Sequence, residues 1–167
     1  HALLVQGEQT PLHLTAELDA KDIIHSLLKA GAETGVEDGQ LRTPLLLACA
    51  SKALGAAQAL IQGGAPLGVR DRNDMTALHW MASHGAQALV QLALAKGADV
   101  NAMDYHMHTP LWFAVQKAHV GCVETLLEHG ADVEQVDDLK RTMLHLAMQY
   151  GSGGLEESAD SHAILQK

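Results

Sequence analysis

The chain has 167 residues, of which 47% are hydrophobic and 19% charged, a composition typical of one folded body rather than a disordered segment. Eleven Lys and Arg against twenty Asp and Glu give a net charge of -9, which disfavours nucleic acid as a partner because phosphate-binding surfaces need clustered cations. The longest apolar run, 45–50, is far shorter than the roughly 20 residues that span a bilayer, so we expect no direct membrane insertion.

Two cysteines, Cys49 and Cys122, are the only ones in the chain. A small secreted scaffold usually carries a dense, even set of cysteines, so we expect a reducing compartment and a cytoplasmic location. Because the chain opens with His1 and not Met, we expect a fragment from which a targeting signal or further domains have been separated.

The first nine residues do not fit the pattern of the rest. Leu3, Leu4 and Val5 resemble the end of a helix, but only Glu8 and Gln9 follow before Thr10. We therefore expect residues 1–9 to be the remnant of a preceding repeat or an N-terminal cap.

Residues 10–151 repeat with a period of 33. Three markers keep this spacing in phase: a Thr with Leu two residues later, a Gly-Ala pair, and an Asp. They stand at Thr10, Thr43, Thr76, Thr109 and Thr142; at Gly31, Gly64, Gly97 and Gly130; and at Asp38, Asp71, Asp104 and Asp137. Such self-similarity is typical of a solenoid, in which each unit stacks on its neighbours.

The sequence pattern of each unit predicts two helices and a loop. Thr followed by Pro, as in Thr10-Pro11, is an N-cap before a residue suited to the first helical turn. A second apolar stretch with helical spacing follows, and the Gly at 31 and its equivalents is expected to end it in the left-handed conformation. Eleven residues then lead to the next Thr, enough for an extended turn or hairpin in which the recurring Asp caps the turn.

The C-terminal residues 152–167 depart from the period. Ile164-Leu165 lies five residues later, relative to its Thr, than Leu126-Leu127 does in the preceding unit. We interpret 152–167 as an inserted loop and a truncated second helix of a fifth repeat. The composition of Gly151-Ser152-Gly153-Gly154 leaves a tethered peptide as the alternative.

Thr10-Pro11-Leu12-His13, Thr76-Ala77-Leu78-His79 and the run Gly97 to Ala102 resemble the TPLH and GADVNA motifs of ankyrin repeats. The resemblance implies an all-α ankyrin-repeat solenoid of stacked helix-turn-helix units, whose projecting loops form a concave groove that binds a peptide or protein segment. Two features depart from the family pattern. The usual Gly two residues before Thr is replaced by Glu8, Leu41, Asp74, Met107 and Lys140, and Leu46 and Trp112 replace the histidine.

The resemblance also suggests where a partner binds. The position four residues after each Thr holds Leu14, Leu47, Trp80, Phe113 and Leu146, a row expected along the groove. Trp80 and Phe113 are candidate anchors, with the alternative that they only fill the interface between repeats. The flanking candidates are Arg72, Asn73, Met75, Ser83 and His84 in the third unit, and Tyr105, His106, His108, Gln116 and Lys117 in the fourth.

Chemistry at other sites is weakly indicated. His106 and His108 lie beside Asp104 but no third clear ligand is nearby, so we expect no metal, and no motif implies a cofactor. His119 and Cys122, three residues apart, could form the base and nucleophile of a thiol catalytic pair, but Cys122 is expected in the core. We therefore expect a non-enzymatic binding scaffold with a neutral or basic protein partner, a structural spacer in a longer array being the alternative and a metal or thiol enzyme a remote one.

Overall fold

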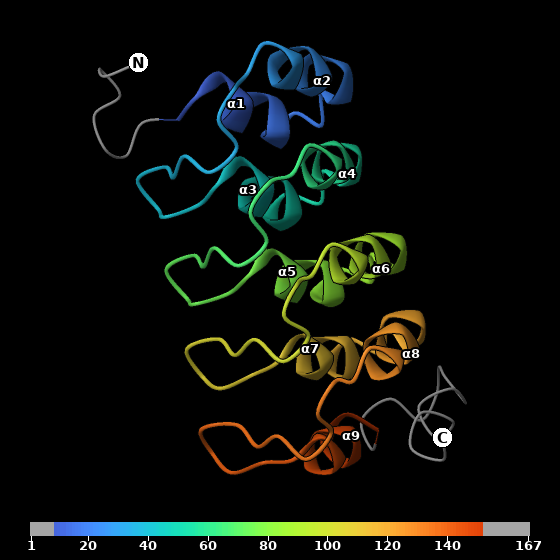
Figure 1. Cartoon of the computed structure of the whole chain (residues 1–167). Coiled ribbons are helices and arrows are strands. Elements are labelled where there is room, and N and C mark those ends of the chain that lie inside the picture. Colours follow the sequence, from blue (N-terminus) through green and yellow to red (C-terminus); the bar gives the residue numbers. More distant parts are fainter. Residues whose placement is uncertain (1–8, 152–167) are drawn as a thin grey trace.

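The computed structural model describes residues 9–151, which form a stack of helix pairs (Figure 1). The predictions for residues 1–8 and 152–167 lie outside this range. Within it, the first helices of the units are α1 (Pro11–Glu17), α3 (Pro44–Ala50), α5 (Ala77–Ser83), α7 (Pro110–Gln116) and α9 (Met143–Gly151). The second helices are α2 (Lys21–Lys29), α4 (Leu54–Gln62), α6 (Gln87–Ala95) and α8 (Val120–Glu128). None of the described helices has the length and hydropathy needed to cross a bilayer.

The first helices begin as the threonines predict. The Thr43 and Thr109 hydroxyls accept the backbone N–H three residues on, and Pro44 and Pro110 open the helices. In α1 the Thr10 N–H donates to Nδ1 of His13 at 3.1 Å, which completes a reciprocal cap. Nε2 of His13 also lies 2.9 Å from the Arg42 carbonyl oxygen, so the capping histidine joins one unit to the next.

The second helices end at the predicted glycines. Gly31, Gly64, Gly97 and Gly130 have φ between +82° and +90°. In the first unit Gly31 N–H donates to the Leu28 carbonyl and Ala32 N–H to the Leu27 carbonyl, the two hydrogen bonds of a Schellman motif. The Gly-Ala marker is therefore a helix stop, as expected.

The turn between the two helices of a unit is a second left-handed position. Asp19, Lys52, Gly85 and Ala118 have φ between +53° and +70°. The side chain of Asp19 uses this geometry to accept the Ala56 N–H at 2.6 Å, at the first turn of α4 in the following unit. Sequence analysis did not predict these turns.

The core runs the length of the stack. First helices pack on first helices and second on second, with both kinds in contact within a unit. Leu12, Leu45, Leu78 and Leu111, two residues after the first four recurring Thr, are at most 2% exposed, whereas Leu144 in the last unit is 54% exposed. The hairpins project from the first helices on the side away from the second helices (Figure 1). The stack thus has a face of first helices and hairpins and a face of second helices.

Candidate functional site

The hairpins owe their shape to the recurring aspartates. In the 104–108 hairpin, Asp104 Oδ1 accepts the N–H groups of His106 at 2.9 Å and His108 at 2.8 Å. The Asp104 N–H donates to the His108 carbonyl at 3.0 Å. Oδ1 of Asp38, Asp71 and Asp137 accepts the same two backbone groups in the 38–42, 71–75 and 137–141 hairpins. The predicted turn-capping role of these aspartates is confirmed.

The second carboxylate oxygen of each aspartate takes a side-chain donor. A guanidinium nitrogen of Arg42 lies 2.7 Å from Asp38 Oδ2, and one of Arg141 lies 2.6 Å from Asp137 Oδ2. Each of these arginines stands directly before the recurring Thr of its unit. His108 holds that place for Asp104, with Nδ1 at 3.3 Å. In the 71–75 hairpin the place belongs to Met75, which has no donor.

There the donor comes from Trp80 instead. Its indole N–H donates to Asp71 Oδ2 at 3.1 Å, from α5 and nine residues away. Asp71 is only 9% exposed, so a carboxylate without this bond would be left partly desolvated. Trp80 therefore supports the 71–75 hairpin as well as offering part of its ring to solvent.

Burial and hydrogen bonding shift the pKa values of these carboxyl groups in opposite directions. Burial raises the pKa of Asp38, but hydrogen bonds from the Arg42 side chain and backbone outweigh it, so the pKa is lowered overall. The pKa of Asp137 is lowered by the same balance, with Arg141 as the donor. Both hairpins are held by charged carboxylates at neutral pH.

Neighbouring hairpins are tied to one another. The Tyr105 N–H donates to the Asn73 carbonyl at 3.0 Å, and the Asp138 N–H to the His106 carbonyl at 3.1 Å. The Arg72 guanidinium donates to the Gly39 carbonyl. The four hairpins therefore present one connected surface rather than independent loops.

Exposed apolar side chains gather on the 104–108 hairpin. Tyr105 is 74% exposed, Met103 40% and Met107 41%, and Leu139 on the next hairpin is 67% exposed. We call Met103, Tyr105 and Met107 the apolar tip. Met103 was not among the sequence candidates, although it stands six residues before Thr109, where Arg70 stands in the preceding unit.

The predicted groove row is only partly exposed. Leu14 is 50% exposed, but Leu47 and Leu146 are at most 2% exposed, so the row is not a continuous surface. Trp80 and Phe113 are half-buried and pack against the core. The Phe113 ring also meets the rings of His79 and His108 edge to face, at centroid distances of 5.9 and 5.8 Å.

The flanking candidates divide by exposure. Met75 is only 7% exposed: its backbone closes the 71–75 hairpin, and its side chain turns inward and offers little surface to a partner. Arg72, Asn73, Tyr105, His106 and Lys117 are exposed; Ser83, His84, His108 and Gln116 are half-buried. His84 lies against Trp80, and burial lowers its pKa.

The 137–141 hairpin adds two carboxylates, Asp137 and Asp138, that were not among the candidate binding residues. Asp138 Oδ2 lies 2.9 Å from Nδ1 of His106, and this hydrogen bond raises the pKa of His106. Asp137 Oδ2 lies 3.8 Å from Nε2 of His108, whose ring stacks on Trp112 at 3.7 Å. Even so, no group of three or more ligating side chains in residues 9–151 is placed to hold a metal ion.

The cysteines have the environment of core thiols. Cys122 is 1% exposed, and burial raises its pKa to about 11. His119 directs Nε2 to the Ser83 carbonyl at 3.1 Å. A buried, protonated thiol is a poor nucleophile, and the His119 ring is already hydrogen-bonded to another group. Burial likewise raises the pKa of the Cys49 thiol to about 12.

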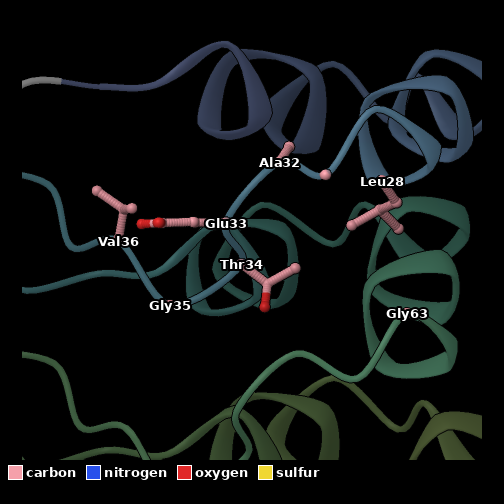
Figure 2. A pocket seen from close by; sticks show the side chains of 8 residues that line it. Leu28, Ala32, Glu33, Thr34, Gly35, Val36 and Gly63 are labelled. Atoms are coloured by element: carbon pink, nitrogen blue, oxygen red, sulfur yellow. The ribbon is translucent and has the colours of Figure 1, made fainter. Parts of the chain in front are cut away.

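One open hollow lies away from the candidate surface. It has a volume of about 730 Å³ and lies where the loop after α2 passes α4 (Figure 2). Leu28, Ala32 and Gly63 line one side, and a Cβ on Gly63 would come within 2.6 Å of Leu28 Cδ1. The helices therefore pack closely beside the hollow, which includes none of the candidate residues.

Comparison with known proteins agrees with this architecture. We find no match among curated proteins. A model of ankyrin repeats in three copies matches residues 45–137 and 105–156, which together cover more than half of the chain. With the 33-residue period, the paired helices and the capped hairpins, this match shows that the chain belongs to the ankyrin-repeat family.

Proposed function

We propose that this chain is a scaffold that binds a peptide or protein segment along the concave side formed by the first helices and hairpins, with the apolar tip at its centre. Ankyrin repeats are generally protein–protein interaction modules, and the family is typically non-enzymatic. The observation that carries the more specific proposal is the exposure of Met103, Tyr105 and Met107 on one hairpin. Aromatic residues and Met are enriched in protein interfaces, and such anchors dominate binding energy.

The backbone around the tip supports the same role. The 104–108 hairpin is closed by Asp104 and bonded to the hairpins on both sides through Tyr105 and Asp138. A surface held in this way loses little conformational entropy when a partner binds. A spacer has no need of exposed Tyr and Met side chains, so these residues favour the binding scaffold over the spacer.

The chemistry of the partner follows from charge. A chain with net charge -9 attracts basic protein surfaces, does not repel neutral ones and repels phosphate backbones, so association with a basic partner is expected to slow as salt rises. The proposal includes a reducing compartment such as the cytoplasm, since Cys49 and Cys122 are buried free thiols.

The experiment compares capture by two matched variants. The unaltered chain is immobilised and exposed to cell lysate, and the proteins retained are identified and their affinities measured with purified material. Met103→Ser with Tyr105→Ser should weaken binding of the retained protein at least roughly tenfold, as expected when hot-spot side chains are truncated. Val133→Ser, which changes a side chain 48% exposed on the loop after α8, should leave the affinity unchanged.

Circular dichroism checks that both variants keep the native helix content. Equal affinity for the tip variant and the unaltered chain would contradict the proposed centre of binding. A partner lost only with Val133→Ser would place binding on the loops behind the hairpins.

A further inference from the structure

The outward positions of the second helices change in charge along the stack. The 33-residue period makes Lys21, Leu54, Gln87 and Val120 equivalent positions, followed four residues later by His25, Gln58, Gln91 and Glu124. Four residues later again, the equivalent positions hold Lys29, Gln62, Ala95 and Glu128. Within this set of positions α2 carries Lys21 and Lys29, α8 carries Glu124 and Glu128, and α4 and α6 carry no charge. With Asp22, which is exposed as well, α2 has one net positive charge and α8 has two negative ones, so the face grades from weakly basic to uncharged to acidic.

The uncharged middle is accessible. Leu54 is 48% exposed, and Gln62, Gln87 and Gln91 are also exposed. A hollow of about 480 Å³ lies between α4 and α6, and every residue lining it is uncharged, including Leu54, Gln58 and Leu92. A helix on the surface of a soluble protein usually turns a charged face to water, so two adjacent helices without any Asp, Glu, Lys or Arg are unusual.

We propose that this face binds a second copy of the chain, with the stack order of the two copies reversed. A two-fold axis parallel to the second helices, between α4 and α6, places each α4 on the partner's α6 and each α2 on the partner's α8. Residues at equivalent positions then lie opposite one another. Lys29 faces Glu128 of the partner subunit, and Gln58 faces Gln91 of the partner subunit.

This order is favoured by the charges at every position of the second helices. Asp22, the acidic residue on α2, falls opposite Gly121 of the partner subunit, and Lys96, just after α6, falls opposite Gly63 of the partner subunit. On the second helices themselves, no two like charges therefore meet. The alternative axis, along the stack, lays α2 on the partner's α2 in the opposite direction and brings Lys21 against Lys29 of the partner subunit, which is repulsive.

The proposal is independent of the hairpin face, because the second helices lie on the opposite side of the stack (Figure 1). Loss of partner binding at Tyr105 and loss of self-association are therefore separate results. A back-to-back pair leaves both hairpin faces open and makes the scaffold bivalent.

The test uses sedimentation equilibrium of the 167-residue chain over a range of concentrations. The unaltered chain should form a dimer whose population rises with protein concentration. Gln58→Glu with Gln91→Glu should weaken association at least about tenfold, because two pairs of like charges meet across the axis. Gln58→Glu with Gln91→Lys should restore it, because the same positions then carry opposite charges.

A second pair of variants exchanges the charges at the two ends of the face, on α2 and α8. Lys29→Glu should weaken the dimer, and Lys29→Glu with Glu128→Lys should recover it. Thermal unfolding followed by circular dichroism confirms that each variant is folded, and all four positions carry helix-forming residues before and after exchange. A chain that stays monomeric up to roughly 1 mM overturns the proposal, as does a dimer equally stable in the Glu/Glu and Glu/Lys variants.

Discussion

The bond from Trp80 to Asp71 permits a quantitative test of how the hairpins are held. Trp80→Phe keeps an aromatic ring in α5 but removes the N–H that lies 3.1 Å from Asp71 Oδ2. Asp71 is 9% exposed and Met75 supplies no replacement donor. Hydrogen bonds to charged groups contribute roughly 1.5–3 kcal/mol, so we expect the free energy of unfolding to fall by about 2 kcal/mol.

The other hairpins suggest the rescue. Where Arg42 and Arg141 occupy the place of Met75, they donate to Asp38 and Asp137. Met75→Arg should therefore be more favourable in the Trp80→Phe background than in the unaltered chain, where Oδ2 is already bonded and only the contacts of the buried Met75 side chain are lost.

Urea unfolding monitored by circular dichroism gives the four free energies of this cycle. The reasoning is refuted if Trp80→Phe costs less than about 0.5 kcal/mol, or if Met75→Arg has the same effect in both backgrounds.

Three further predictions address the backbone and the histidines. Gly97→Val should lower the free energy of unfolding by about 1–2 kcal/mol, because φ is +90° although a Cβ meets no atom within 4 Å; an unchanged urea midpoint would speak against strain as the cause. Leu41→Gly should raise the melting temperature, because Leu41 has φ +60° and the relief of roughly 1–2 kcal/mol of backbone strain exceeds the roughly 0.5–1 kcal/mol entropy cost of glycine; a lower melting temperature would count against strain at this position. The pKa of His79 is lowered by burial and that of His106 is raised by its bond to Asp138, so NMR titration should place them below and above 6.5. The unfolded chain then binds a proton that folded His79 resists, so this residue makes stability fall as pH drops below about 6.5. The stabilisation by His106 has the opposite sign and is lost as pH rises through its folded pKa. The reverse order of midpoints would refute both assignments.

Local rules explain why much of the fold was predictable. The Thr caps, the Gly at 31 and its equivalents, and the turn-capping Asp each act on backbone groups within a few residues, and each recurs at the same place in successive units. The left-handed turns at Asp19, Lys52 and Ala118 have no such signal, because these positions share no residue type and adopt φ near +55° under the constraint of the two helices they join.

The binding surface was less predictable, because it depends on contacts between units. Met75 and Met107 lie in equivalent hairpins one position apart, yet Met75 is 7% exposed and Met107 is 41% exposed. The bond from His106 to Asp138 joins residues 32 apart and requires the spacing of adjacent hairpins. Trp80 was predicted as an anchor from its aromatic type and its place four residues after Thr76, and neither feature indicates its bond to Asp71, which lies nine residues away.

Photo-crosslinking at the apolar tip tests most directly whether this scaffold binds proteins through its hairpins. Benzoylphenylalanine is placed at Tyr105, which is 74% exposed, and in a control chain at Val133, which is 48% exposed on another loop. We predict that irradiation in lysate links the Tyr105 chain to a distinct protein partner and that excess unlabelled chain suppresses the adduct. Adducts of equal yield from both positions, or from Val133 alone, would contradict the account.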